Sequence, residues 1–312
     1  MTVAVLNAFT QKLLEGRIPA GVDVRYFHNG DELRALAPEA EIGWFDSFDG
    51  TPVREILELA QNLQWFHTIA AGVDFFPLEL FRERGVTMTN SAGLNSITIA
   101  EYAVMGMLVI AKGYREVVRS QERHEWMPDA PGKQELYGSK LLIVGAGGIG
   151  GRVAELLAPW GLDITTVRRN PAPGALTPDE WRGKLGEFDW VVIAVPSTPD
   201  TARMMGAAEF AAMKKGAAVL NFSRGNVLDQ EALMDAVRGG QVGGAFLDVT
   251  DPEPLPSDHP LWGFDNIHIT SHLSGRSQTT LIARSAERFL DNLARWQRGE
   301  ALEGTVDLSL GY

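Results

Sequence analysis

The glycine-rich stretch that follows residue 144 constrains the fold of this chain more than any other feature. Gly145, Gly147 and Gly150 form the pattern G-x-G-x-x-G after the apolar run LLIV (141–144) and at the head of a helical pattern. In a strand-turn-helix unit, the first glycine permits a tight turn and the second lets a pyrophosphate approach the backbone, while the third lets helix and strand pack closely. Two interpretations remain open here: a dinucleotide site, or a glycine-rich turn without a ligand.

Short apolar runs alternate with helical patterns along the chain, which predicts parallel sheets with crossover helices. In the first part we expect strands at 3–8, 23–29, 41–45, 64–72 and 86–90, and helices at 31–37, 53–63 and 77–85. A long helical pattern at 96–122 precedes a second series with near-continuous apolar runs at 141–144, 190–195 and 217–222, as is typical of strands covered on both faces. A late helix at 279–299 leads the chain back toward the first part.

Composition excludes several classes of function. The chain has no cysteine, which rules out disulfides, thiolate zinc sites and a cysteine nucleophile, and we expect no metal site. Lys and Arg number 28 against 40 Asp and Glu, and a net charge of −12 argues against a nucleic-acid partner. The apolar run 102–111 is too short to span a bilayer, and the first fifteen residues do not resemble a secretory signal. We therefore expect a soluble cytoplasmic protein without a membrane partner.

Three further stretches carry reactive side chains directly after predicted strands. Arg224 follows the run 217–222, Asp248 and Glu253 follow the next strand, and His272 follows the one after that. Carboxyl ends of parallel strands meet at one edge of a sheet, where ligands bind in doubly wound folds. An arginine, an acid or a histidine taken alone is more often structural than catalytic. The chain also has five other histidines, so the presence of a histidine alone does not indicate a site. The convergence of the four named side chains on one edge is what indicates a site.

The end of the strand at 162–169 bears on the choice of cofactor. An NAD site usually places an acid there, about twenty residues past the glycine motif, for the ribose hydroxyls. This chain has Arg168 and Arg169 instead, followed by Asn170. Two planar guanidinium groups match the oxygens of a 2′-phosphate, which favours NADP over NAD. The alternative is a solvated surface pair.

Taken in order, the motifs GAGGIG, NFSRG, DVTDPEP and SHLSG, with IAAGVD (69–74) and NSITIAEYAV (95–104), resemble the D-isomer-specific 2-hydroxyacid dehydrogenases, in particular the glyoxylate/hydroxypyruvate reductase-like branch. The resemblance implies an α/β fold of two doubly wound parallel-sheet domains with a cleft between them. A flavodoxin-like catalytic domain would comprise 1–97 and 288–312, and a Rossmann cofactor domain 98–287. The family also implies a homodimer formed through the cofactor domain.

Reduction of a small 2-oxo acid requires a hydride at C2, which the cofactor supplies, and a proton at the forming alkoxide. His272 can donate that proton. Glu253 can accept a hydrogen bond from the other ring nitrogen, orient the imidazole and raise its pKa. Arg224 can bind the substrate carboxylate and polarise the carbonyl group.

The resemblance implies further contacts. The backbone amides of Ala71, Gly72 and Val73 would hold the substrate carboxylate, and Asp248 would bind the nicotinamide end of the cofactor. The remaining cofactor contacts would come from Gly148, Ile149, Pro196, Phe222, Ser223, Ser274 and Gly275.

Several aromatic residues have two possible roles. Trp44 resembles a tryptophan that overhangs the substrate in glyoxylate/hydroxypyruvate reductases, and Phe75 and Phe76 follow the predicted carboxylate loop. Trp126 could cap the cleft of a neighbouring subunit. For each of them a place in the hydrophobic core or at a helix end is an open alternative.

Other functions remain possible within the same family. Formate dehydrogenases carry glutamine at the position of Glu253, so the acid here argues for a hydroxy acid. A phosphoglycerate dehydrogenase-like enzyme and a cofactor-sensing protein of the corepressor type stay open. Residue 271 is serine where many members have proline, which puts the rigidity of the histidine loop in doubt.

Overall fold

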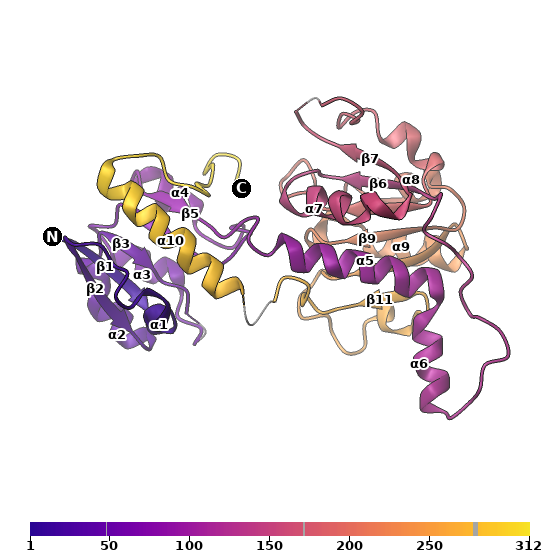
Figure 1. The fold of residues 1–312 in the computed structure, drawn as a ribbon, viewed down its shortest axis with the longest axis horizontal. Helices are drawn as coiled ribbons and strands as arrows, with labels where there is room; N and C mark the ends of the chain where they lie inside the picture. Colours follow the sequence, from indigo (N-terminus) through magenta and orange to yellow (C-terminus); the bar gives the residue numbers. More distant parts are fainter. Residues whose placement is uncertain (48, 171, 277–279) are drawn as a thin grey trace. The chain divides into compact units, whose positions relative to one another are not determined.

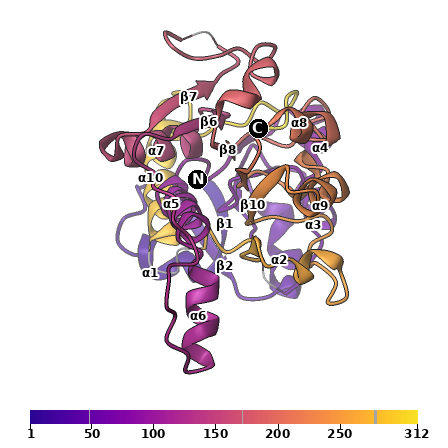
Figure 2. The ribbon, with the colours of Figure 1, turned by 90° about the vertical axis from the view of Figure 1, so that its right-hand side faces the viewer.

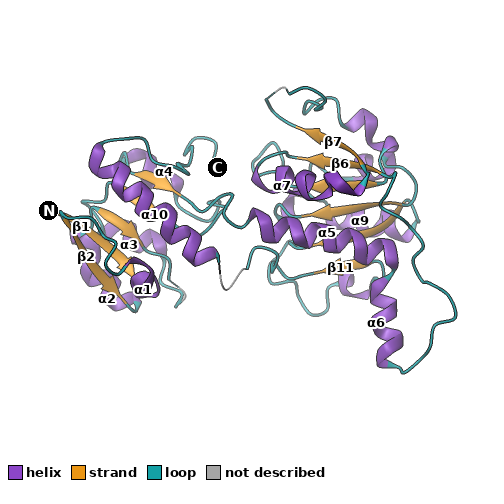
Figure 3. Cartoon of the chain, viewed as in Figure 1, coloured by secondary structure: helices purple, strands orange, loops and turns teal. Residues whose placement is uncertain are grey.

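The structure, a computed structural model, describes residues 1–47, 49–170, 172–276 and 280–312. The chain forms two compact units, one made of Met1–Asn95 with Ser277–Tyr312 and the other of Ser96–Arg276. Each unit contains one parallel sheet with helices on both of its faces (Figure 3). The predicted fold class, two doubly wound α/β domains, is confirmed.

The sheet of the first unit has five parallel strands in the order β2-β1-β3-β4-β5, which is the flavodoxin-like order. Its strands are β1 (Thr2–Asn7), β2 (Val22–Phe27), β3 (Ile42–Trp44), β4 (Trp65–His67) and β5 (Thr87–Thr89). Its helices are α1 (Gln11–Leu14), α2 (Gly30–Leu36), α3 (Val53–Leu59), α4 (Leu78–Glu83) and α10 (Leu281–Arg298), with short 3-10 turns η1 (Ala8–Thr10) and η2 (Ala37–Glu39).

Helix α10 lies along one face of this sheet (Figure 1). Its Phe289 ring stacks on Trp65 with 5.0 Å between the ring centroids and lies 5.3 Å from Trp44. Ala286 and Leu293, three and four residues from Phe289, join the same buried cluster. The spacing of these side chains gives α10 one apolar face, which is buried against the sheet.

The structure corrects both predicted domain boundaries. A boundary at residue 288 would divide α10, which is continuous from Leu281 to Arg298 and belongs wholly to the first unit. A boundary at residue 97 would fall inside the first turn of α5, which begins at Ser96. Since a helix buries its apolar face as one body, each of these two helices lies wholly within one unit. Residue 279, where the late helix was expected to begin, lies outside the described residues.

The sheet of the second unit has six parallel strands in the order β11-β10-β9-β8-β6-β7. Its strands are β6 (Lys140–Val144), β7 (Asp163–Val167), β8 (Trp190–Ile193), β9 (Ala217–Asn221), β10 (Val242–Leu247) and β11 (Ile267–Ile269). A single parallel bridge between Val167 and Leu176 adds a rudimentary strand outside β7. Counted with that bridge, the order around β6 is that of a Rossmann fold, whose winding reverses between β6 and β8.

The helices of the second unit cover both faces of this sheet (Figure 1). They are α5 (Ser96–Lys112), α6 (Tyr114–Glu122), α7 (Gly148–Leu157), α8 (Ala207–Ala212) and α9 (Gln230–Arg238), with 3-10 turns η3 (Ala158–Trp160), η4 (Arg182–Glu187), η5 (Gly225–Val227) and η6 (Pro260–Gly263).

The helical pattern at 96–122 is not one helix, as its continuity suggested, but two. The chain bends by 71° between α5 and α6 (Figure 2). Gly113 at the bend has φ +59°, and a Cβ there would lie 3.0 Å from the amide nitrogen of Gly132. Within the described residues no single helix is long and apolar enough to cross a membrane, although this bent pair passes that test by length and composition.

Candidate active site

The glycine-rich turn joins β6 to α7 as the sequence predicts. Gly145 has φ +99°, and a Cβ there would lie 2.5 Å from the carbonyl oxygen of Ala194. A Cβ on Gly150 would lie 2.0 Å from the Gly145 oxygen, so turn and helix pack without room for a side chain. At Gly147, the N-cap of α7, no atom lies within 4 Å of a Cβ position. The turn leaves an open approach to the first amides of α7, which fits a dinucleotide pyrophosphate.

Arg168, Arg169 and Asn170 follow β7 directly and are exposed. The amide of Arg168 donates to the carbonyl oxygen of Leu176 at 2.9 Å, so the backbone pairing continues one residue beyond the strand. None of the three residues is an acid. The strand end therefore presents cationic side chains where an NAD-selective site offers a carboxylate.

Arg224 follows β9 in a loop that Asn221 organises. The Asn221 side chain donates to the Arg224 carbonyl oxygen at 3.0 Å and accepts from the Ser223 amide at 3.0 Å. A Cβ on the next residue, Gly225, would lie 2.0 Å from the carbonyl carbon of Thr250, so the loops after β9 and β10 are in backbone contact. Sequence reasoning missed Gly225, although a glycine directly after the predicted arginine was a usable signal.

Glu253 and His272 form a direct pair. The Glu253 Oε2 atom lies 2.8 Å from Nδ1 of His272, and Oε1 accepts a hydrogen bond from the Thr250 amide at 3.0 Å. Both side chains are partly exposed. In the described part of the chain Nε2 of His272 has no hydrogen-bond partner. The ring is thus held through one nitrogen, and the other is available to a substrate.

Asp248, at the end of β10, holds the loop that carries His272. Its carboxylate is 2% exposed, and Oδ1 accepts from the Thr270 hydroxyl at 2.7 Å and from the amides of Leu273 and Ser274 at 3.1 Å each. The Ser274 hydroxyl donates to Oδ2. The structure therefore gives this carboxylate a role inside the protein that the sequence did not indicate, and its predicted contact with the nicotinamide stays a prediction.

A loop in the first unit presents free backbone amides. Residues 68–73 follow β4, and the Ser91 amide donates to the Ala70 carbonyl oxygen at 3.0 Å while the Asn90 side chain donates to that of Ala71 at 2.7 Å. Within the described residues the amides of Ala71, Gly72 and Val73 donate no hydrogen bond. Ala71 and Gly72 are partly exposed, whereas Val73 is 1% exposed, so the first two amides are the accessible donors, and adjacent amide donors are suited to binding a carboxylate.

Comparisons with known proteins identify the family. Residues 104–274, more than half of the chain, match the family model described as D-isomer specific 2-hydroxyacid dehydrogenase, NAD binding domain. The chain belongs to this family. It is an oxidoreductase of the D-2-hydroxyacid dehydrogenase type with a domain that binds a nicotinamide dinucleotide.

Relatives in this family differ in what their names report. A glyoxylate reductase of Korarchaeum cryptofilum is 32% identical over 79% of this chain and 76% of its own length. A D-3-phosphoglycerate dehydrogenase of Methanocaldococcus jannaschii is 30% identical over 83% of this chain, which spans only 50% of that relative. The solved structure of a D-isomer specific 2-hydroxyacid dehydrogenase from Xanthobacter autotrophicus, in complex with NADPH and MES, is 26% identical and covers 100% of this chain and 99% of its own, with a TM-score of 0.81. The substrate is therefore not determined by membership of the family.

Ser271 replaces the proline that many 2-hydroxyacid dehydrogenases have before the histidine. Ser271 and His272 both have positive φ, at +50° and +57°. Proline is locked near a φ of about −65° and cannot adopt this conformation. The doubt about loop rigidity is answered by Asp248, whose hydrogen bonds span residues 270–274.

Other predicted cofactor residues of this family member lie at the same edge of the sheet, but some side chains are engaged inside the protein. The Phe222 ring is buried in the core, 5.9 Å from Phe246, and its predicted contact with the cofactor stays a prediction. The Ser223 hydroxyl accepts from the Val195 amide at 2.9 Å. The remaining predicted residues are at the start of α7 (Gly148 and Ile149), at an exposed position after β8 (Pro196) and at a partly exposed position in the histidine loop (Gly275).

The structure decides the roles of most of the aromatic residues. Trp44 is 0% exposed, with its ring 4.6 Å from His67, so its predicted place over the substrate is wrong. Phe76 is also buried in the core, whereas Phe75 is exposed. Trp126 is 96% exposed, so both it and Phe75 are accessible to another molecule.

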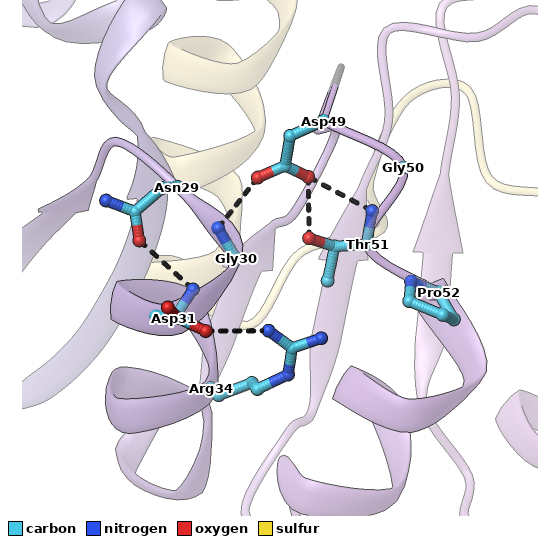
Figure 4. A pocket seen from close by; sticks show the side chains of 8 residues that line it. All are labelled: Asn29, Gly30, Asp31, Arg34, Asp49, Gly50, Thr51 and Pro52. Carbon is cyan, nitrogen blue, oxygen red and sulfur yellow. Dashed lines mark hydrogen bonds and ion pairs between the residues drawn. The ribbon is translucent and has the colours of Figure 1, made fainter.

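The first unit has a polar pocket with a volume of about 290 Å³ that is lined by none of the predicted site residues. Figure 4 shows the residues that line it. Its centre is Asp49, which accepts from the Gly30 amide at 2.8 Å and from the Thr51 amide at 3.0 Å. Hydrogen bonds from the Ser47 and Thr51 hydroxyls hold the pKa of Asp49 well below its ordinary value. The start of α2 is thus already capped by the protein's own carboxylate. No cluster of metal-ligating side chains occurs among the described residues.

Proposed function

We propose that this protein uses NADPH to reduce a small 2-oxo acid, of the glyoxylate or hydroxypyruvate type, to the D-2-hydroxy acid. The observation that carries the proposal is the 2.8 Å contact between Nδ1 of His272 and Glu253, on loops that follow the strands of the dinucleotide-binding sheet. This is the arrangement that a proton donor beside a hydride donor requires.

In the proposed mechanism, a nicotinamide cofactor held by the glycine-rich turn would supply the hydride for C2 of the substrate. His272, protonated on both nitrogens, gives its Nε2 proton to the oxygen at C2 as that oxygen gains negative charge. Glu253 accepts the hydrogen bond from Nδ1 and keeps the ring in the orientation that presents Nε2. The oxidised cofactor and the 2-hydroxy acid are the products.

The substrate carboxylate is assigned to two groups. The Arg224 guanidinium matches a carboxylate with paired N–H donors and polarises the neighbouring carbonyl. The unpaired amides of Ala71, Gly72 and Val73 supply further donors. A short 2-oxo acid has no other charged group, so these contacts would provide most of its binding.

The preference for NADPH rests on Arg168 and Arg169. A 2′-phosphate adds negative charge beside the ribose, and the end of β7 carries two cations and no acid. That the Xanthobacter autotrophicus relative was solved with NADPH agrees with this choice. We also assign the remaining predicted cofactor contacts, including Asp248, to the nicotinamide dinucleotide.

We further propose a homodimer formed through the second unit. Helices α5 and α6 and the loop after them expose large apolar side chains at Met105, Tyr114, Val117, Val118 and Trp126. Sedimentation equilibrium would test this, and Trp126→Ala with Val118→Lys should shift a dimer toward the monomer.

The proposal includes a cytoplasmic location and no nucleic-acid partner. The absence of a nucleic-acid partner is supported by the net charge of −12.

The deciding experiment is a panel of 2-oxo acids assayed by loss of NADPH absorbance, with NADH in parallel. Glyoxylate and hydroxypyruvate should be reduced faster than 3-phosphohydroxypyruvate. A preference for the phosphorylated acid would favour the phosphoglycerate dehydrogenase-like alternative. Tight NADPH binding without turnover on any acid would favour a cofactor-sensing protein.

A further inference from the structure

A carboxylate that belongs to neither Asp248 nor Glu253 lies beside the loop that presents the free amides. We infer that Asp46 is a positioning residue for the substrate: it holds residues 68–73 in the shape that leaves the amides of Ala71 and Gly72 available to the substrate carboxylate. This inference rests on the proposed function and adds a residue to it.

Asp46 follows β3 and is partly buried. Its Oδ1 atom accepts from the Thr68 hydroxyl at 2.8 Å. Its Oδ2 atom accepts from the Ile69 amide at 2.8 Å and from Nε1 of Trp44 at 2.7 Å. Two of these three donors belong to the amide loop, and the third comes from a side chain fixed in the core.

These hydrogen bonds determine which amides of the loop are already bound within the protein and which are left to bind a ligand. The Ile69 amide is bound to Asp46, and the Thr68 hydroxyl, which donates to Asp46, accepts from the Ala70 amide at 3.1 Å. The first free amide is therefore that of Ala71. Asp46 thus occupies the Ile69 amide directly and the Ala70 amide through the Thr68 hydroxyl.

The opposite side of the loop is held by residues after β5. The carbonyl oxygens of Ala70 and Ala71 point toward Ser91 and Asn90, which donate to them. In a trans peptide the C=O and the following N–H point in opposite directions. The amides of Ala71 and Gly72 must then point away from residues 90–91, and both residues are partly exposed.

Burying the charged carboxylate of Asp46 costs free energy, which its hydrogen bonds offset. Burial raises the pKa of Asp46, while the hydrogen bonds from Ile69, Thr68 and Trp44 act in the opposite direction. The same contacts explain Trp44: the tryptophan predicted to cover the substrate instead supports the carboxylate that shapes the substrate loop.

The test compares Asp46→Ala, Asp46→Asn and the control Asp49→Asn, an acid three residues away that bonds to its own loop and to the start of α2 (Figure 4). KM and kcat are measured with glyoxylate, and the Kd of oxalate, a carboxylate that cannot be reduced, is measured by calorimetry on the NADPH-loaded protein. We expect Asp46→Ala to raise KM and the oxalate Kd about tenfold or more, since it removes three hydrogen bonds, with kcat and NADPH affinity nearly unchanged.

Asp46→Asn should bring both values back to within about threefold of the unaltered protein, because its oxygen can serve Ile69 and Trp44 and its amino group can donate to Thr68. Asp49→Asn should change neither. If Asp46→Ala does not fold, Thr68→Val removes the link to Ala70 at constant volume and should raise the oxalate Kd in the same way.

Unchanged oxalate affinity in the folded Asp46→Ala or Thr68→Val variant would overturn the inference and leave the proposed function standing. An unaltered protein that neither reduces a 2-oxo acid nor binds oxalate would overturn both.

Discussion

The main-chain amide of His272 donates a 2.5 Å hydrogen bond to the carbonyl oxygen of Asp248, whose carboxylate binds the residues on both sides of the histidine. Two consecutive residues with positive φ, Ser271 and His272, are held in place by this one aspartate. A non-glycine residue in this region is strained and needs support from its surroundings. The position of the proton donor therefore depends on a buried acid 24 residues earlier in the chain.

Asp248→Ala should lower kcat although Asp248 does not itself donate the proton. The reason is that the loop carrying His272 loses the carboxylate that anchors it. Each buried donor left unpaired costs about 1 to 3 kcal/mol, so the free energy of unfolding of the second unit should fall as well. Steady-state kinetics and chemical denaturation measure the two effects. Asp251→Asn, which changes an exposed acid further along the same loop after β10, is the control and should change neither. A fully active Asp248→Ala variant would show that the loop holds its shape without the carboxylate.

His272→Ala should lose most turnover and keep its affinity for NADPH. Loss of a general acid typically costs about 100- to 10,000-fold in rate. Glu253→Gln keeps an oxygen that can accept from Nδ1 but removes the charge, so the pH profile of kcat should move toward lower pH while cofactor binding is retained. The checks are kcat as a function of pH and calorimetric titration with NADPH. A profile that does not move would mean that Glu253 orients the ring without tuning it.

Arg224→Lys retains a positive charge but loses the planar pair of donors. We expect a higher KM for the 2-oxo acid together with a lower kcat, since the same group binds the carboxylate and polarises the carbonyl. A 2-oxo amide, which lacks the carboxylate, should be a poor substrate of the unaltered protein. Equal reduction of the amide and the acid would remove Arg224 from substrate recognition.

Arg168→Ala should weaken NADPH binding by about ten- to hundredfold and leave NADH binding nearly unchanged, because only NADPH carries the 2′-phosphate. Arg169→Ala should have a smaller effect. Calorimetric titration with both cofactors tests this. Lys214→Ala is the control: Lys214 precedes β9, at the end of the sheet where the strands begin, and pairs there with Asp189 at 2.6 Å. Equal affinities for NADPH and NADH in the unaltered protein would reduce the two arginines to surface charges.

The stability of the first unit should decrease in acid because of His67. Burial lowers the pKa of this ring to about 3, and its nitrogens are bound to the hydroxyls of Thr89 and Ser285 at 2.9 and 3.0 Å. Below its ordinary pKa of about 6.5 the unfolded chain takes up a proton that the folded protein does not, so stability falls as the pH is lowered. The contribution is roughly 2 kcal/mol between pH 7 and pH 5.

Chemical denaturation at the two pH values checks this expectation. His67→Gln should be less stable at neutral pH but should lack that part of the pH dependence. His28→Gln, which changes an exposed histidine, should retain it. The same pH dependence in all three proteins would assign it to other groups.

Much of this fold could be predicted from local pattern. The apolar runs at 141–144, 190–195 and 217–222 became β6, β8 and β9, because strands buried on both faces must be apolar throughout. The glycine motif predicted its own turn, since φ at Gly145 and the close contact at Gly150 admit no side chain. Arg224, Glu253 and His272 could be brought together because each follows a strand of one parallel sheet, whose carboxyl ends share an edge.

The sequence did not determine which groups the buried polar side chains bind, nor the residue at which a helical pattern ends. Trp44 is equally apolar in a core or over a substrate, and only the packing of α10 placed it inside. Gly113 stands inside a continuous helical pattern, but its backbone adopts φ +59° and the helix is divided there. Asp248 and Asp46 each depend on donors more than twenty residues away. Periodicity reports how deeply a side chain is buried, whereas its hydrogen-bond partner is decided only when distant segments fold together.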